Sequence, residues 1–327
     1  MLRLPPFRYH RPASLAEAVA LLGEHAGDVM PVAGGTDLIP NMKHRLFEPG
    51  HLVALKGIPE LRGVRQEGGY LRIGAGETLS AVASDPAVVS RFPALADAAG
   101  HVAGPQLRNM GTIGGNLCLD TRCTYYNQTL FWRKALGYCL KKDGSACHVV
   151  KGGTRCVAAH SADAATALLP LEAELRIVGP EGERTIPISS FFTSDGVWNR
   201  RMEPGELLVT IHVPRPTAGT RHSFQKLRAR DSIDFPLLNL AVRVDFTEAE
   251  TVADLQIAAS GMGSYPRKLG KVGAAAVGSR LTDAVVEEVT RQAFRQCHPL
   301  DNISVDAEWR HAMVPVLVRR ALSEIGG

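Results

Sequence analysis

The stretch Ala33-Gly34-Gly35-Thr36-Asp37, here called the first glycine loop, follows a short apolar run at Val29–Val32 and precedes the apolar Leu38-Ile39-Pro40. Glycines at such a strand-to-helix turn let backbone N–H groups point inward and form a concave anion-binding site, and a helix start adds a favourable dipole. The hydroxyl of Thr36 adds a further donor. A pyrophosphate group suits this loop, although the turn also needs glycine for its geometry alone.

A second glycine loop of the same kind lies at Gly111-Thr112-Ile113-Gly114-Gly115-Asn116. Two such loops can hold the two ends of a dinucleotide, so the pair favours nucleotide binding more than either loop alone. The nearest approach to a Rossmann fingerprint, Gly261-Met-Gly-Ser-Tyr-Pro266, ends in proline and lacks the acidic residue expected further on. We therefore reject a Rossmann site there.

Length and composition place the chain among ordinary globular proteins. Its 327 residues suggest two or three domains, and 45% hydrophobic with 21% charged residues exclude wholesale disorder, collagen and coiled coil. A net charge of +4 is too balanced to indicate nucleic acid as a partner. No apolar run approaches the ~18 residues of a membrane span, and the first residues lack a secretory signal. We expect a cytoplasmic protein without a membrane span.

The order of strand and helix signals divides the chain into three parts. We expect a first α/β unit over 1–56, a longer mixed part over 57–217, and a last part over 218–327 after the break at Pro214-Arg-Pro216. Ser14 is a plausible N-cap for a helix over Leu15–Leu22. Helices are also expected from Thr282 to about Gln296 and from Ala307 to Ile325, where Pro315 predicts a kink or an earlier start.

Residues 121–160, here called the insert, differ from the rest of the chain in composition. They contain four of the six cysteines, Cys123, Cys139, Cys147 and Cys156, with 15, 7 and 8 residues between them. Four thiolates are the full ligand set of a 4Fe-4S cluster or of a structural zinc ion, and the absence of close C-x-x-C pairs leaves the metal open. Disulfides are not expected in a reducing cytoplasm, whereas four buried structural cysteines remain an alternative.

Charge in the insert favours iron and sulfur over zinc. The insert has seven basic residues against the single acid Asp143. This surplus would stabilise a negatively charged cluster, and side chains such as Lys141 and Lys142 would steer an acidic redox protein to the surface. We expect Cys118 and Cys297 to be small buried residues rather than ligands. His148 and His160 flank the outer cysteines but are not needed as ligands.

Several motifs in order resemble the flavin subunits of molybdenum hydroxylases, the xanthine dehydrogenase and carbon monoxide dehydrogenase medium-subunit family. They are the two glycine loops, Asp163 in Ala162–Pro170, the segment Pro204–Ile211, and Phe224-Gln-Lys226 with Arg230 and Asp234. The resemblance covers residues 4–322. It implies an α+β fold, in which a two-subdomain FAD-binding domain is followed by a C-terminal α+β domain.

The resemblance also implies roles for individual residues. Ala33, Gly34, Gly35, Thr36 and Asp37 would cradle the FAD pyrophosphate, and Thr112, Gly115 and Asn116 would hold its other side. Asp163 would accept hydrogen bonds from the adenosine part, while Leu208 and Lys226 would line the flavin's neighbourhood. Without the resemblance, Leu208 reads as a core leucine and Lys226 as a solvated strand lysine. No catalytic residue is expected in this chain, because nothing in it resembles a molybdopterin site.

Most members of this family pass directly from the second glycine loop to the Asp163 helix, so the insert is unusual. It resembles the insert of the flavin subunits of 4-hydroxybenzoyl-CoA reductases, which implies a 4Fe-4S cluster on Cys123, Cys139, Cys147 and Cys156 and anaerobic aromatic degradation. Electrons would pass from a ferredoxin-like donor through 4Fe-4S and FAD to the 2Fe-2S small subunit and the molybdopterin-binding large subunit, in a dimer of heterotrimers.

Two alternatives remain open at this point. One is the flavin subunit of an ordinary molybdenum hydroxylase that oxidises an aromatic or N-heterocyclic substrate. The other is a non-redox protein with a structural zinc beside a bound nucleotide.

Overall fold

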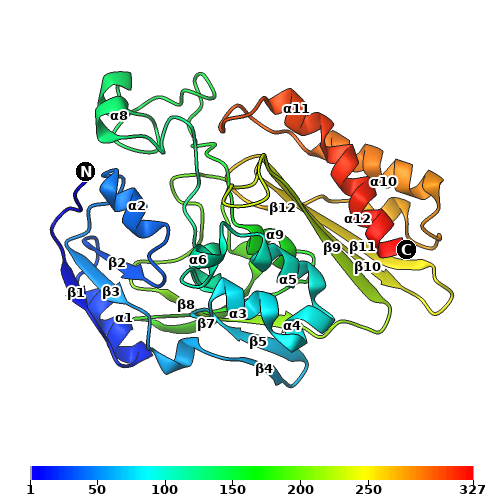
Figure 1. Cartoon of the computed structure of the whole chain (residues 1–327), viewed down its shortest axis with the longest axis horizontal. Helices are drawn as coiled ribbons and strands as arrows, with labels where there is room; N and C mark the ends of the chain where they lie inside the picture. The colour runs from blue at the N-terminus through cyan, green and yellow to red at the C-terminus, as the bar shows by residue number, and fades with distance from the viewer. Residues whose placement is uncertain (1, 327) are drawn as a thin grey trace.

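The computed structural model describes residues 2–326 (Figure 1). Its strands are β1 (Arg8–His10), β2 (Val29–Val32), β3 (His51–Ala54), β4 (Val64–Glu67), β5 (Tyr70–Gly74), β6 (Glu174–Gly179), β7 (Gly182–Pro187), β8 (Leu207–Pro214), β9 (Thr220–Leu227), β10 (Leu238–Phe246), β11 (Val252–Ser260) and β12 (Arg267–Lys268). Its α-helices are α1 (Leu15–Glu24), α2 (Leu38–Lys43), α3 (Leu79–Ser84), α4 (Pro86–Arg91), α5 (Pro93–Gly100), α6 (Pro105–Arg108), α7 (Ile113–Leu117), α8 (Leu130–Leu136), α9 (Asp163–Leu168), α10 (Asp283–Gln296), α11 (Ala307–Ala312) and α12 (Val314–Gly326). Separate sheets and helical layers confirm the expected α+β class.

The first sheet is parallel, with strand order β1-β3-β2. Helix α1 begins after Ser14, whose hydroxyl accepts a hydrogen bond from the N–H of Glu17, so the predicted N-cap is confirmed. Ala18 and Leu22 of α1 are buried with Val53 of β3. This layer supplies the first glycine loop, which leaves the end of β2.

The second sheet is antiparallel, with order β4-β5-β8-β6-β7, and carries the largest core. Helices α3, α5, α7 and α9 contribute apolar side chains to this core. Every residue of α9 is buried, including its first residue, Asp163. The second glycine loop leads into α7, which packs against this core. Each glycine loop is therefore connected to a well-packed layer.

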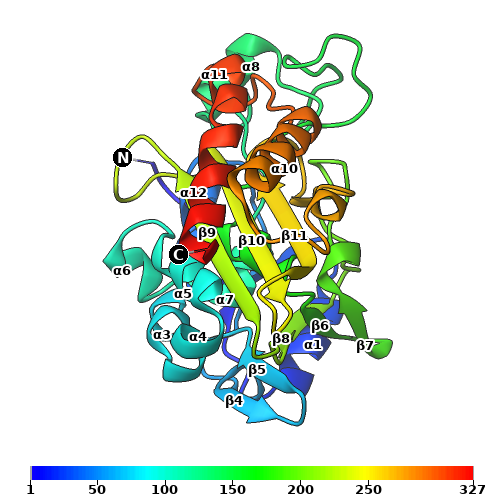
Figure 2. The same cartoon turned by 90° about the vertical axis from the view of Figure 1, so that its right-hand side faces the viewer.

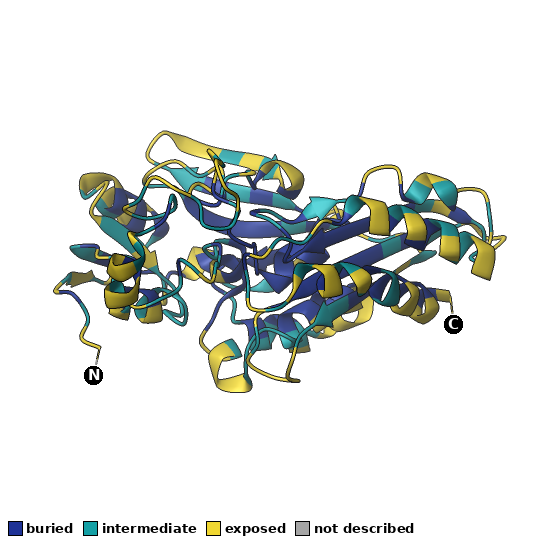
Figure 3. Cartoon of the chain, turned by 90° about the horizontal axis from the view of Figure 1, so that it is seen from above, coloured by how far each residue is buried: buried dark blue, intermediate teal, exposed yellow. Residues whose placement is uncertain are grey.

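The third sheet, β12-β11-β10-β9, is antiparallel and is covered on one face by α10 and α12 (Figure 2). In Figure 3 these strands are dark with burial, while the outer sides of their helices are exposed. The predicted helix after Thr282 is confirmed as α10. The predicted helix over 307–325 is divided into α11 and α12, and Pro315 is the second residue of α12, where a missing N–H costs little.

The insert lies between α7 and α9 and has α8 as its one α-helix in the described chain. The rest of it is loop and turn, and Figure 1 shows α8 standing away from the three sheets. Strands of the three sheets come from residues 8–54, 64–214 and 220–268 respectively, and we keep 1–56, 57–217 and 218–327 as proposed parts. Within residues 2–326, no helix combines the length and apolar character needed to cross a membrane.

Candidate functional site: two glycine loops and a cysteine insert

The first glycine loop packs directly on the backbone that precedes the second. A Cβ atom on Gly34 would lie 2.0 Å from the carbonyl oxygen of Met110, so only glycine allows this approach. Gly35 has φ +69°, a left-handed conformation that favours glycine. Asp37 precedes α2, but its side chain makes no cap hydrogen bond to that helix. The two loops are therefore held together by backbone contact.

The second glycine loop is fixed by hydrogen bonds within the chain. The hydroxyl of Thr112 accepts a hydrogen bond from the N–H of Gly115 at 3.0 Å and so caps α7. A Cβ atom on Gly114 would lie 2.6 Å from that of Ala75, which explains a glycine there. The side-chain oxygen of Asn116 accepts a hydrogen bond from the N–H of Ala164 in α9. This loop is thereby tied to the helix that carries Asp163.

A pocket of about 40 Å³ lies where the two glycine loops meet. Residues of the first and second loop regions share its walls, namely Ala33, Leu55, Lys56, Arg62, Gly76, Thr78, Asn109, Met110 and Thr112. Lys56 and Arg62 bring positive charge to it, which suits a phosphate group. A larger hollow of about 630 Å³ beside α1 is lined by none of the predicted site residues.

Asp37 links the first glycine loop to the insert. Burial raises the pKa of its carboxyl group to about 6, and the nearby Arg122 guanidinium acts in the opposite direction. The shortest contact between the two side chains is 3.4 Å. The guanidinium of Arg122 also lies 3.9 Å from the ring centre of Phe235. One arginine of the insert thus contacts the first loop and the C-terminal part together.

Asp163 and Lys226 form a buried ion pair between the part over 57–217 and the part over 218–327. Lys226 Nζ lies 2.8 Å from one carboxylate oxygen of Asp163, and the amide of Asn239 donates to the other oxygen at 2.8 Å. The two side chains of the pair are 1% and 3% exposed, so Lys226 is not a solvated lysine. Lys226 also donates to the carbonyl of His101. Leu208 lies buried in the core of the second sheet.

Cys139, Cys147 and Cys156 lie close enough to Cys123 to act on its thiol, although loops separate them in sequence and no three of the four sulfurs lie within 4.8 Å of one another in the described residues. Burial raises the pKa of the Cys123 thiol to about 11, a backbone hydrogen bond at Tyr125 lowers it, and nearby Cys156, Cys139 and Cys147 raise it further. Backbone N–H groups point at two of the other sulfurs, from Val150 to Cys147 Sγ and from Ala158 to Cys156 Sγ. The candidate metal ligands are therefore four thiols, two of which accept hydrogen bonds from backbone N–H groups.

Two cations hold the insert against the rest of the protein. Arg133 is 1% exposed and donates from Nη2 to the carbonyl oxygens of His44 and Arg45. Lys141 is paired with Asp120 at 2.7 Å, and its side chain is 5% exposed. The expectation that Lys141 steers a docking protein is therefore wrong, because its buried side chain is turned inward to pair with the partly buried carboxylate of Asp120. Lys142 is more exposed and is available at the surface.

The remaining thiols and histidines have other surroundings. Cys297, the C-cap residue of α10, is buried, and Cys118 is partly buried with its sulfur 3.8 Å from that of Met202. His148 lies 2.6 Å from the carbonyl oxygen of Tyr138 through Nε2. Burial lowers the pKa of His160 to about 3. Sequence reasoning missed the structural roles of Arg122, Arg133 and Lys141, for which the excess of positive charge was the only signal.

Two family models together match almost the whole chain. The FAD binding domain in molybdopterin dehydrogenase matches residues 5–216, and the CO dehydrogenase flavoprotein C-terminal domain matches residues 222–325. The chain belongs to the FAD-binding subunits of the molybdenum hydroxylase family. The resemblance to that family is thus confirmed, and residues 5–216 are an FAD-binding domain.

Known relatives support the same family. The medium chain of carbon monoxide dehydrogenase from Hydrogenophaga pseudoflava is 33% identical over 98% of this chain and 96% of its own. The nicotine 6-hydroxylase medium subunit of Paenarthrobacter nicotinovorans is 27% identical over 99% of both chains. The solved structure of carbon monoxide dehydrogenase from Hydrogenophaga pseudoflava superposes with a TM-score of 0.80 at 32% identity, over 98% of this chain and 97% of the other. The chain is an oxidoreductase subunit with the fold of these flavoproteins.

Proposed function

We propose that this chain is the flavin subunit of a molybdenum hydroxylase complex that oxidises an aromatic or N-heterocyclic substrate. Relatives named for xanthine and nicotine act on N-heterocycles, which supports this substrate class. The partners would be a molybdopterin-binding large subunit and a 2Fe-2S small subunit, in a dimer of heterotrimers, and the compartment would be the cytoplasm. FAD, when bound, supplies one- and two-electron redox chemistry.

The observation that carries this proposal is the pocket between the two glycine loops, which Ala33 of the first loop and Thr112 of the second both line. We assign Ala33, Gly34, Gly35, Thr36 and Asp37 to one side of the pyrophosphate and Thr112, Gly115 and Asn116 to the other. Backbone N–H groups, hydroxyls and the positive charge of Lys56 and Arg62 suit an anion there.

Asp163, Leu208 and Lys226 complete the proposed FAD-binding set. The pair of Asp163 and Lys226 is fully engaged within the protein, so we assign it a positioning role, holding α9 against β9 beside the cofactor. Leu208 contributes an apolar wall from β8.

The test is the flavin content of the purified chain and of Thr112→Ala and Thr290→Ala variants. Thr112→Ala removes the cap of α7 and should lower FAD occupancy several-fold. Thr290→Ala changes a buried threonine of α10, away from the loops, and should keep it. Wild-type chain that folds without flavin, or equal occupancy in both variants, would overturn the assignment.

A second candidate function rests on the insert. We propose that Cys123, Cys139, Cys147 and Cys156 hold a 4Fe-4S cluster, and that the complex is a reductase of the 4-hydroxybenzoyl-CoA type. Reduction would consume two electrons from a ferredoxin-like donor and two protons, replacing the phenolic hydroxyl by hydrogen and releasing water to give benzoyl-CoA. The complex would then serve anaerobic degradation of aromatic compounds.

The convergence of the four thiols supports this ligand set, since each of the other three influences Cys123. Four thiolates are the full ligand set of a 4Fe-4S cluster. N–H donors at Cys147 and Cys156 are typical tuning contacts of cluster sulfurs.

Metal analysis separates the two candidate functions. Chain purified without oxygen should contain about four irons and little zinc, and Cys147→Ser should lose iron while keeping FAD. Cys118→Ser is the matched control, because that thiol lies outside the insert and contacts Met202. Iron-free wild-type protein, or equal iron loss in the two variants, would exclude the cluster and leave the hydroxylase function.

A further inference from the structure

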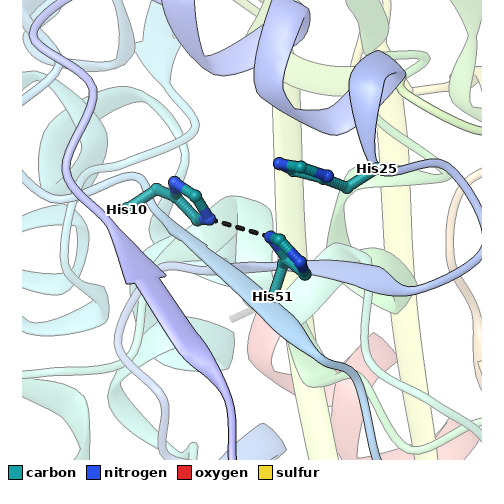
Figure 4. Close-up of side chains that lie close together, drawn as sticks. All are labelled: His10, His25 and His51. Atoms are coloured by element: carbon teal, nitrogen blue, oxygen red, sulfur yellow. Dashed lines mark hydrogen bonds between the residues drawn. The ribbon is translucent and has the colours of Figure 1, made fainter.

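We propose that His10, His25 and His51 form a binding site for a divalent transition-metal ion of the zinc, nickel or copper type. One ring nitrogen from each histidine lies within 4.8 Å of the others, and no other group of three or more His, Cys, Asp or Glu residues in the described chain meets this condition (Figure 4). The site lies on the first sheet, and it is independent of FAD and of the cysteines of the insert.

Three different elements bring these histidines together. His10 ends β1, His51 begins β3, and His25 caps the C-terminus of α1. In the parallel register Arg8 pairs with His51, so His10 lies two residues further along its strand and on the same face as His51. Figure 4 shows the ring of His25 reaching over this face from α1. Residue numbers 10, 25 and 51 give no ligand motif, so only the fold reveals the cluster.

The contacts among the three rings place their nitrogen lone pairs close enough to bind one metal ion. His10 Nε2 and His51 Nδ1 lie 2.9 Å apart, and one of them must be an acceptor with a lone pair directed at the other. The rings of His25 and His51 have centres 3.7 Å apart at an angle of 32°. Because His25 lies over His51, a rotation of its ring is required to aim its lone pair at the ion. All three residues are partly buried, which leaves a side open to water.

Backbone and side-chain contacts around the cluster hold its histidines in place, and histidine binds metal as the neutral imidazole. The backbone of Asp28 accepts a hydrogen bond from the N–H of His51, which fixes the strand entry. Glu24 lies 3.9 Å from His25 Nε2 and can orient that ring from outside the site.

The donor chemistry selects the class of ion. Three imidazole nitrogens with an open position suit zinc, nickel or copper, whereas magnesium and calcium require oxygen ligands. A bound ion would cross-link the end of α1 to β1 and β3. It would stabilise the first layer, from which the first glycine loop leaves, by favouring the folded state through mass action.

The test is a Zn²⁺ titration of the full, FAD-loaded chain at pH 7.5, measured by isothermal titration calorimetry. We expect the wild type to bind one Zn²⁺ ion at this site, with an affinity that His51→Gln lowers at least 100-fold. His298→Gln is the matched control, because it removes an exposed histidine from outside the cluster and should bind as the wild type does. The effect of His51→Gln should persist in a Cys147→Ser background, which separates this site from the thiols of the insert.

A second measurement avoids any dependence on folding of the variants. In the wild type, Zn²⁺ affinity at this equivalent should fall at least tenfold from pH 7.5 to 5.5, because protons compete for the three imidazoles. A Zn²⁺ ion should also raise Tm in the wild type and in His298→Gln but not in His51→Gln. Equal Zn²⁺ affinity in wild type and His51→Gln, or affinity independent of pH, would overturn the proposal.

Discussion

The two glycine loops and the cysteine insert are built in different ways. The loops are held by backbone contact, with Gly34 against Met110 and Gly114 against Ala75, and their pocket exists in the chain alone. The insert is held mainly by buried cations, Arg133 on backbone carbonyls and Lys141 on Asp120, while its thiols lie between loops. In the glycine loops an added Cβ atom at Gly34 or Gly114 would clash with the backbone, so a single substitution should disturb the whole site. In the insert each anchoring side chain makes its own contacts, so a single substitution should weaken only those contacts.

The largest expected effect is that of Gly34→Ala. The added methyl group would meet the Met110 carbonyl oxygen and push the two loops apart, which should cost about 3 kcal/mol of unfolding free energy and most of the bound flavin. Gly69→Ala is the control, since a Cβ atom there has no neighbour within 4 Å. Thermal unfolding and flavin absorbance measure both effects. Equal behaviour of the two variants would mean that the loops are not held by this contact.

Lys141→Met should have the next largest effect, and it should be confined to the insert. Asp120 would lose its partner in a mostly buried position, which should cost about 2 kcal/mol while leaving FAD bound. Lys142→Met removes an exposed lysine next to Asp143 and should cost less than about 0.5 kcal/mol. Chemical denaturation with proteolysis of the insert distinguishes the two. Flavin loss in Lys141→Met would show that the two regions are not independent.

The pH dependence of stability tests the contact between the two regions at Asp37. Because burial raises the folded-state pKa of Asp37 from 3.8 to about 6, the folded protein binds more protons than the unfolded chain between these values. The free energy of unfolding should therefore fall as pH rises from about 4 to about 6, by about 1 kcal/mol after solvent screening. Asp37→Asn should remove this slope, and exposed Asp231→Asn should retain it. A slope unchanged by Asp37→Asn would assign it to another group.

The smallest expected effect concerns electron entry at the insert. Lys142→Glu reverses one exposed charge and should slow association with an acidic one-electron donor a few-fold at low salt, with a weaker salt dependence. Lys43→Glu, outside the insert, serves as the comparison. Stopped-flow reduction at several salt concentrations measures this rate. An unchanged salt slope would move donor docking away from this surface.

Much of the fold was predictable because its signals are local. Ser14 and Thr282 mark helix starts through side-chain and backbone chemistry, and Pro315 marks a break because it has no N–H. The glycine loops were found from composition for the same reason. The burial of Lys141 and the approach of Gly34 to Met110 were not predictable, because both depend on which distant segments meet. The three histidines likewise come together only through strand register.

Asn302 ties the insert to a segment that is synthesised much later. Asn302 is fully buried, its backbone carbonyl accepts a hydrogen bond from the N–H of Thr124, and its side-chain amide donates to the backbone carbonyl of Val157. The hydroxyl of Thr124 reaches the same carbonyl across a sequence separation of 178 residues. At 5–20 residues per second, roughly 10 to 35 seconds pass between the emergence of these partners. During that interval the insert cannot form its hydrogen bonds with Asn302. Its thiols are therefore exposed to small molecules of the cell before the C-terminal part packs against the insert.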